Sequence, residues 1–329
     1  MVLAERPGKL CAAKRSTVLQ YRRPAMRIAI PDLISNSYFP VIAAVELGFF
    51  KREGLDVQLE LMVPFEKALA ALGDGSIQFL GCSSHLVVGG FPEWRGAKLL
   101  CAQAQGMYWF LVIRSDLKAA RGDLGAVKGL RIGAAHWVGM ALRHLLAGSG
   151  IDPERDRVQI APIPGAHDPG VSFGVAAAQA LAEGRVDGFW ANGMGAELAV
   201  RRGVGTVVLD ARRDPSVPSY TMASVVASDQ LIAEEPEAAA AAVRSVVAAQ
   251  RALKENVALA RRVGRKLFPE AEAELITDLI ARDLPFYSAA ISRKDVERMI
   301  GFSRAAGILK RHPDYEEVVS TRFEPLWGG

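Results

Sequence analysis

The chain has 329 residues, of which 50% are hydrophobic and 23% are charged, a balance typical of a globular protein with a sizeable core. This composition excludes disorder as the main state. The sequence contains no charge-free run of 18 apolar residues, which argues against an integral membrane protein with spanning helices. The length predicts two domains, because single cores stop growing near this size.

The net charge of +4 is concentrated at the N-terminus, since residues 1–25 contain six basic residues and one acidic residue. The remainder is nearly neutral and has no basic stripe, which argues against a nucleic-acid partner. Lys9, Lys14 and Arg15 interrupt every apolar stretch that a secretory signal would need. We therefore expect residues 1–25 to be a disordered leader, with Met26 as an alternative start of translation.

Cysteines and histidines form no pattern that indicates a disulfide framework or a metal site. Cys11, Cys82 and Cys101 form no CxxC pair, and the five histidines show no HxxH or HExxH spacing. The glycines at 193–195 and 203–205 fit neither a GxGxxG motif nor a P-loop with its lysine. We therefore expect no metal and no cofactor.

From Arg27 onward, short β-rich runs alternate with longer helical patterns. In the first block, strands are predicted at 27–30, 56–62, 77–80, 98–102 and 109–114, with helices at 38–52 and 65–72. In the second block, strands are predicted at 130–133, 158–162, 186–190 and 206–209, with helices at 136–148, 174–183 and 196–202. A strand at 220–227 and helices at 236–268, 270–283 and 292–308 follow.

This alternation predicts an α/β protein with two lobes, each a mostly parallel sheet flanked by helices. We expect a discontinuous first lobe comprising residues 26–115 and 220–329, and a second lobe comprising residues 116–219. The chain would cross between the lobes twice, and the two crossings would form a hinge.

Four stretches resemble a known family, and the resemblance covers residue 26 to about residue 327. They are Ser35–Leu55 (SNSYFPVIAAVELGFFKREGL), Gly75–Ser84 (GSIQFLGCSS), Lys128–Ala135 (KGLRIGAA) and Gly184–Asn192 (GRVDGFWAN). They are similar to the type II periplasmic-binding-protein fold, in its family of nitrate, sulfonate, taurine and pyrimidine-precursor binding proteins of ABC importers. That family also contains thiamine-pyrimidine synthases and some desulfinases.

The resemblance implies that the two lobes close over a small molecule, which contacts loops at the carboxyl ends of the strands. Three of these loops precede helices, whose free N–H groups and positive dipole ends favour an anion or a polar acceptor. The candidate ligand-binding residues are Ser35, Asn36, Tyr38, Ser83, Ser84, His85, Gln105, His136, Trp137, Trp190, Asn192 and Tyr220.

Several of these candidates also have a structural interpretation. Residues 35–37 are N-cap candidates for the helix at 38–52, and His85 fits a hydrogen-bonded structural histidine. Trp190 follows a strand and is expected to line the cleft, whereas Trp109 lies in an apolar run and is expected to be core. An anion held by N–H groups and hydroxyls, and a neutral heterocycle stacked on Trp137 or Trp190, both remain open.

The loops offer caps, aromatic rings and amides but no nucleophile paired with a base, so we expect no catalytic residue. The predicted function is a solute-binding protein of an ABC-type importer that captures a sulfonate, taurine, nitrate or a pyrimidine-like molecule. Its expected partners are this ligand and, if the chain is exported, a permease and an ATPase. We expect a monomer that touches the membrane only through the permease.

The alternative is a cleft enzyme or a cytoplasmic ligand sensor with the same fold. Residues 81–84 lack the cofactor-binding lysine of the synthases, and residues 219–227 lack their cysteines. Cys82 and His85 are spaced so that they could form a catalytic Cys/His pair. The competing interpretation is that Cys82 is a buried, inert thiol. Without a visible signal sequence, the periplasm and the cytoplasm both remain possible locations.

Overall fold

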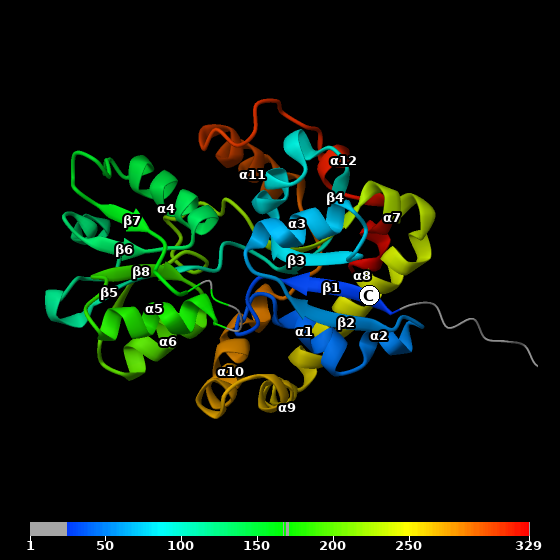
Figure 1. The fold of residues 1–329 in the computed structure, drawn as a ribbon, viewed down its shortest axis with the longest axis horizontal. Helices are drawn as coiled ribbons and strands as arrows, with labels where there is room; N and C mark the ends of the chain where they lie inside the picture. Colours follow the sequence, from blue (N-terminus) through cyan, green and yellow to red (C-terminus); the bar gives the residue numbers. More distant parts are fainter. Residues whose placement is uncertain (1–24, 167, 169–170, 329) are drawn as a thin grey trace, which may run out of the picture.

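The computed structural model describes residues 25–166, 168 and 171–328, and it arranges them as two α/β lobes side by side (Figure 1). The predicted leader at 1–25 lies outside this part of the chain, apart from Ala25. Each lobe is built around one five-stranded sheet.

The first lobe contains the sheet β2-β1-β3-β10-β4. Its strands are β1 (Met26–Ile30), β2 (Val57–Leu61), β3 (Phe79–Ser83), β4 (Ala97–Ala104) and β10 (Ala223–Ser228). β1 pairs in parallel with β2 and β3, whereas β10 runs antiparallel between β3 and β4. Every residue of β3 is buried, as expected for a central strand covered on both faces. The helices that follow these strands are α1 (Phe39–Glu46), α2 (Phe49–Arg52), α3 (Phe65–Gly73), α7 (Asp229–Glu234) and α8 (Pro236–Glu255).

The second lobe contains the sheet β7-β6-β8-β5-β9. Its strands are β5 (Phe110–Arg114), β6 (Arg131–Gly133), β7 (Gln159–Ala161), β8 (Gly188–Ala191) and β9 (Gly205–Asp210). Its helices are α4 (His136–Gly148), α5 (Phe173–Ala182) and α6 (Gly193–Arg201). In both sheets the reversed strand, β10 or β5, is the first strand after a crossing, and the remaining strands share one direction. The predicted fold class is therefore confirmed.

The predicted position of the first crossing is wrong. β5 was expected in the first lobe, with the crossing after residue 115, but it pairs with β8 and β9 in the second sheet. The first crossing therefore comprises residues 105–109, and the second comprises residues 211–222. An apolar run such as FLVIR fits either sheet, because hydrophobicity alone does not specify which strand it pairs with.

Two helices that were predicted as continuous are interrupted. Gly48 adopts a left-handed conformation (φ 76°) between α1 and α2, which a glycine tolerates without steric cost. Asn256 is extended and separates α8 from α9 (Ala258–Leu267). None of the described helices combines the length and apolar character needed to cross a bilayer.

The C-terminal helices of the first lobe also touch the second lobe. α10 (Glu270–Asp283) packs against α6, and α11 (Arg293–Ala305) packs against α4, at two edges of the junction (Figure 1). The final short helix, α12 (Tyr315–Val318), packs beside β4 in the first lobe. The junction is thus bounded by helices as well as by the two crossings.

Gly188, in the centre of the second sheet, provides a test of this packing. A Cβ atom there would lie 2.7 Å from the carbonyl oxygen of Val112 and 2.9 Å from Ile132, so Gly188→Ala should destabilise the protein by about 1–3 kcal/mol. Gly148, at the end of α4, has nothing within 4 Å of that position, and Gly148→Ala should be neutral or slightly stabilising. Urea unfolding of both variants measures the difference, and equal stabilities would contradict the pairing of β8 with β5.

Candidate functional site

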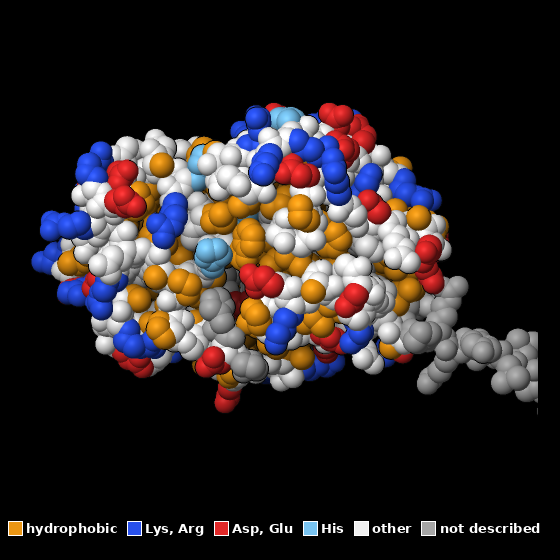
Figure 2. Space-filling view, turned by 45° about the horizontal axis from the view of Figure 1, so that its top comes forward, with side chains coloured by type: hydrophobic (Ala, Val, Ile, Leu, Met, Phe, Trp, Pro, Cys, Tyr) orange, Lys and Arg blue, Asp and Glu red, His pale blue; other side chains and the backbone are white. Residues whose placement is uncertain are grey.

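A cavity of about 330 Å³ lies between the two lobes. Its wall is formed by the loops after β1 and β2, the first crossing, and the loops after β6, β7 and β8. These loops lie at the carboxyl ends of the strands, where open α/β sheets place their ligand sites. Figure 2 shows hydrophobic side chains gathered over the junction of the lobes, with a histidine beside them.

Five of the predicted site residues lie on the cavity wall. Ser35 and Tyr38 come from the loop between β1 and α1, His136 and Trp137 from the start of α4, and Asn192 from the loop after β8. The hydroxyl of Ser35 is buried and has no hydrogen-bond partner among the described residues. It is therefore available to a molecule in the cavity.

A cluster of three hydroxyl groups forms part of the wall. The Ser83 hydroxyl lies 2.6 Å from the Tyr108 hydroxyl, which also contacts the hydroxyl of Tyr38. Burial raises the pKa of both tyrosines, so both phenols are neutral. Ser83 itself does not line the cavity but positions Tyr108, which does.

The expected capping role of residues 35–37 is wrong. α1 begins after Tyr38, whose side chain makes no capping bond, and Pro40 occupies the first turn. A proline there has no N–H group to satisfy, which reduces the need for a polar cap. Asn36 and Ser37 instead contact Asp283 and Arg212, and the Ser35 hydroxyl is left without a partner among the described residues.

Trp137 joins the second lobe to the first at one edge of the cavity. Its indole Nε1 donates to Glu66 of α3 over 2.9 Å, and its ring packs over Gly89. A Cβ atom at Gly89 would lie only 3.0 Å from the ring, so the absent side chain allows this close approach. His136 lies edge-on to the same indole, with the ring centroids 5.9 Å apart.

The expectation that Trp190 lines the cleft is wrong, whereas Trp109 is buried in the core as expected and also lines the cavity. Trp190 is fully buried and does not line the cavity, whereas Trp109, in the first crossing, does. Side chains alternate along a strand, so Trp190 points away from the face to which Ala191 contributes. Trp109 follows Tyr108 where the chain passes between the lobes, and its apolar surroundings concealed this position.

Four other candidates lie away from the cavity wall. The hydroxyl of Ser84 contacts that of Ser224 at 2.7 Å, and Gln105 donates to the carbonyl of Ser288 at 2.9 Å. His85 contacts Thr221 at 3.0 Å, and burial lowers its pKa to about 4, so it is neutral. Tyr220 stacks on Phe302 of α11, with the ring centroids 5.3 Å apart. Ser84 thus packs within the first lobe, and the other three side chains attach the two crossings to it.

Asp32, which was not among the predicted site residues, lines the cavity directly after β1. Its carboxylate accepts hydrogen bonds from the Ile34 amide at 3.0 Å, the Ser172 hydroxyl at 3.2 Å and the Asn192 amide at 2.9 Å. Ser172 and Asn192 precede α5 and α6, so this carboxylate of the first lobe is bound by two helix starts of the second. Its position at the carboxyl end of a strand was the available signal.

Burial raises the pKa of Asp32 to about 6 despite these three hydrogen bonds. No Lys or Arg is found among the described residues that line the cavity. The carboxylate is thus ionised at neutral pH without a basic side chain beside it on the cavity wall. Other missed wall residues are the aromatic side chains Phe65, Tyr108 and Phe173 and the rim carboxylate Glu66.

The raised pKa of Asp32 predicts a pH-dependent stability difference. Because the folded-state pKa exceeds the ordinary value, the ionised carboxylate destabilises the fold above about pH 6, and this cost disappears at low pH. The stability of Asp32→Asn relative to the native chain should therefore rise by about 1–3 kcal/mol between about pH 4 and pH 7. Denaturant unfolding at several pH values measures it, with the exposed Asp56→Asn as control. A difference independent of pH would contradict this account.

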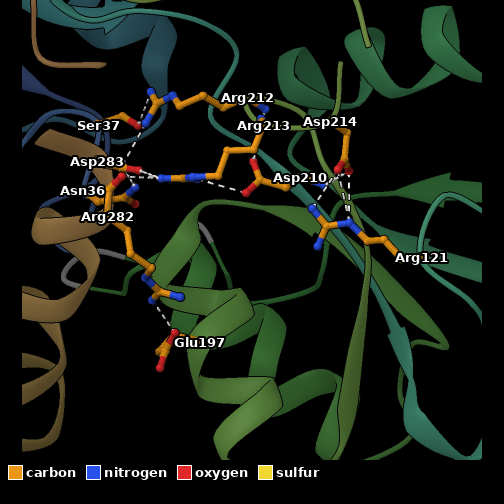
Figure 3. Close-up of polar contacts among 10 residues, drawn as sticks. All are labelled: Asn36, Ser37, Arg121, Glu197, Asp210, Arg212, Arg213, Asp214, Arg282 and Asp283. Carbon is orange, nitrogen blue, oxygen red and sulfur yellow. Dashed lines mark hydrogen bonds and ion pairs between the residues drawn. The ribbon is translucent and has the colours of Figure 1, made fainter. Parts of the chain in front are cut away.

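Asn36 lies in a polar cluster where the second crossing meets the first lobe (Figure 3), away from the cavity wall. The side-chain amide of Asn36 donates to Asp283 at the end of α10. The backbone carbonyl of Asn36 accepts from the Tyr287 hydroxyl at 2.5 Å. Asp283 also binds Arg212 at 2.8 Å and Arg213 at 2.6 Å, both from the second crossing. The expectation that Asn36 lines the cleft is therefore not supported by its position.

The ion pair of Arg212 and Asp283 is almost fully buried, with side-chain exposures of 1% and 3%. Burial alone would raise the pKa of Asp283, but the charges of Arg212 and Arg213 outweigh it and hold that pKa below its usual range. Since each charge compensates the other, removing one would leave a buried charge unpaired.

Asp283→Ala should therefore cost about 3–5 kcal/mol of unfolding free energy. Asp278→Ala, which breaks an exposed pair with Arg201, should cost less than about 1 kcal/mol. Chemical denaturation of the two variants compares them directly. Equal losses would show that the buried pair does not hold the crossing to α10.

Neither member of the Cys82/His85 pair considered for the alternative enzyme lines the cavity. Cys82 is buried within β3, burial raises the pKa of its thiol, and it does not line the cavity. No three His, Cys, Asp or Glu side chains in the described part of the chain are placed to hold one metal ion.

Several solved structures are similar to this fold. The periplasmic nitrate-binding protein NrtA from Synechocystis PCC 6803 is 16% identical, with a TM-score of 0.68 over 92% of this chain and 87% of that one. The alkanesulfonate-binding protein SsuA from Xanthomonas axonopodis pv. citri, bound to MOPS, is 14% identical, with a TM-score of 0.66 over 91% and 97%. The desulfurization enzyme DSZB is 15% identical, with a TM-score of 0.63 over 91% and 98%.

These similarities confirm the periplasmic-binding-protein fold that the sequence resemblance implied. SsuA and NrtA are described as binding proteins, whereas DSZB is described as an enzyme. A comparison of the sequence with curated proteins finds no match. Residues 35–257, more than half of the chain, match the family described as "NMT1/THI5 like". The chain therefore belongs to the NMT1/THI5-like family.

Proposed function

We propose that this protein is the solute-binding component of an ABC-type importer and captures one small organic molecule between its lobes. The cavity of about 330 Å³, with walls from both lobes, is the observation that carries this proposal. A molecule that touches both walls stabilises the arrangement in which the lobes meet, which couples binding to closure. The similarity of the fold to the alkanesulfonate-binding protein SsuA and the nitrate-binding protein NrtA supports the same role.

The wall favours an organic ligand over a small inorganic ion. Trp109, Trp137, Phe65 and Phe173 line the cavity together with the neutral phenols of Tyr38 and Tyr108. Aromatic side chains of this kind offer flat apolar surfaces to a ring or a short hydrocarbon body. The Ser35 hydroxyl and the Asp32 carboxylate supply the polar contacts that orient such a ligand.

The wall residues support a protein that binds its ligand without changing it chemically. A thiol nucleophile would need a lowered pKa and access to the ligand. Cys82 has a raised pKa and lies within β3, outside the wall. A permease and an ATPase are the partners this role requires, with a monomer as the binding unit.

Mass spectrometry of the freshly purified protein under non-denaturing conditions tests this proposal. We expect a copurified small molecule that is lost on denaturation. Ala135→Phe, at the start of α4 on the cavity wall, should fill the space and abolish this mass. The same substitution at Ala120, which is exposed and outside the wall, should retain it. A bound mass unaffected by Ala135→Phe would place the ligand elsewhere, and no bound molecule under any growth condition would reject the proposal.

A further inference from the structure

We propose that the cavity selects a compact organic cation, an aromatic or hydrocarbon body carrying an amine or amidine, with Asp32 as its counter-ion. This inference rests on the proposed solute-binding function and names the ligand class of that same cavity. It differs from the sequence-based expectation, which favoured an anion or a neutral heterocycle.

The first argument is the uncompensated charge of Asp32. A carboxylate has roughly four acceptor positions, and Ile34, Ser172 and Asn192 use three of them. One position remains for a donor from a ligand on the cavity side. The raised pKa agrees with a carboxylate that its neighbours do not fully stabilise. A cation in the cavity would supply the missing interaction, in a setting where a charge-assisted bond is strong.

The second argument is that Asp32 already occupies the place where an anion would bind. The starts of α5 and α6 offer the positive dipole ends that stabilise anions. The residues that precede these helices, Ser172 and Asn192, both donate to Asp32. An anionic ligand would therefore meet a carboxylate at these helix starts. No Lys or Arg on the described part of the wall would compensate the repulsion.

The remaining wall supports the same preference. Trp109, Trp137 and Tyr108 present aromatic rings to the cavity, and ring faces attract cations. Glu66 places a second carboxylate at the rim, where it accepts from Trp137. Arg212 lies over the ring of Tyr108 but is paired with Asp283 and does not line the cavity. Besides the two carboxylates and the two phenols, the described wall carries the titratable side chain of His136, which is exposed.

Three compounds with one ring and different head groups test the proposal on the native protein. Benzamidine is cationic, benzamide is neutral and benzoate is anionic at neutral pH. We expect benzamidine to bind at least about tenfold more tightly than benzamide, and benzoate to bind most weakly, by titration calorimetry. Equal or tighter binding of benzoate would overturn the inference while leaving the solute-binding function intact.

Two further outcomes separate this inference from the proposed function. If none of the three compounds binds but the native protein retains a copurified molecule sensitive to Ala135→Phe, the inference is rejected and the function stands. If neither the compounds nor any copurified molecule binds, both fail.

The variant Asp32→Asn tests whether Asp32 causes the preference for the cation. It should reduce benzamidine binding by about tenfold or more and remove the difference between benzamidine and benzamide. Asp56→Asn, which removes the same charge from an exposed position outside the cavity wall, should leave both affinities unchanged. An unchanged cation preference in correctly folded Asp32→Asn would show that Asp32 is not the counter-ion. Benzamidine selectivity of the native chain decides the ligand class even if this variant does not fold.

Discussion

The cavity depends on one carboxylate that is solvated by the opposite lobe. Asp32 follows the first strand of the first lobe, yet two of its three hydrogen-bond donors, Ser172 and Asn192, precede helices of the second lobe. The Asn192 side chain serves both partners, since its oxygen accepts from the amides that begin α6 while its nitrogen donates to Asp32. At this contact the first lobe supplies the carboxylate, and the second lobe supplies two of its hydrogen-bond donors. The cavity wall is completed by the same contact.

The carboxylates of Asp283 and Asp32 differ in how their charge is compensated. Asp283 binds two guanidinium groups and an amide, and its pKa is lowered. Asp32 is bound only by neutral donors, and its pKa is raised. Proteins tolerate a buried charge at a cost in stability mainly where function requires it. By this reasoning Asp283 holds the second crossing to α10, and Asp32 is retained for what enters the cavity.

The fold was largely predictable because it depends on local patterns. Short β-rich runs that alternate with amphipathic helices require parallel layers, and the strands and helices occur close to their predicted positions. The assignment of Phe110–Arg114 to the first lobe failed because pairing partners are set by the whole sheet. Asn256, which ends α8, is a weaker local signal than the glycine that separates α1 from α2.

The site was predictable only at the level of loops. The wall residues Ser35, Tyr38, His136, Trp137 and Asn192 were found because they follow strands of the two sheets whose carboxyl ends face the junction of the lobes. Which side chain of a loop faces the cavity depends on strand alternation and on the second lobe. This is why Trp190 is core, Trp109 is wall and Asn36 turns toward Asp283. Asp32 also follows a strand, but its contact with Ser172, 140 residues away, depends on the assembled fold and could not be read from the sequence.

The fold alone does not determine which class of ligand binds. The side chains at the helix starts that face the cavity determine it. Several helices of this architecture begin at the cavity, and a helix start stabilises negative charge whoever supplies it. When a ligand supplies that charge, the fold binds anions. In this chain Asp32 supplies that charge at the starts of α5 and α6, through Ser172 and Asn192, before any ligand arrives. A single carboxylate after the first strand thus reverses the electrostatic preference of the cavity without changing the arrangement of strands and helices around it.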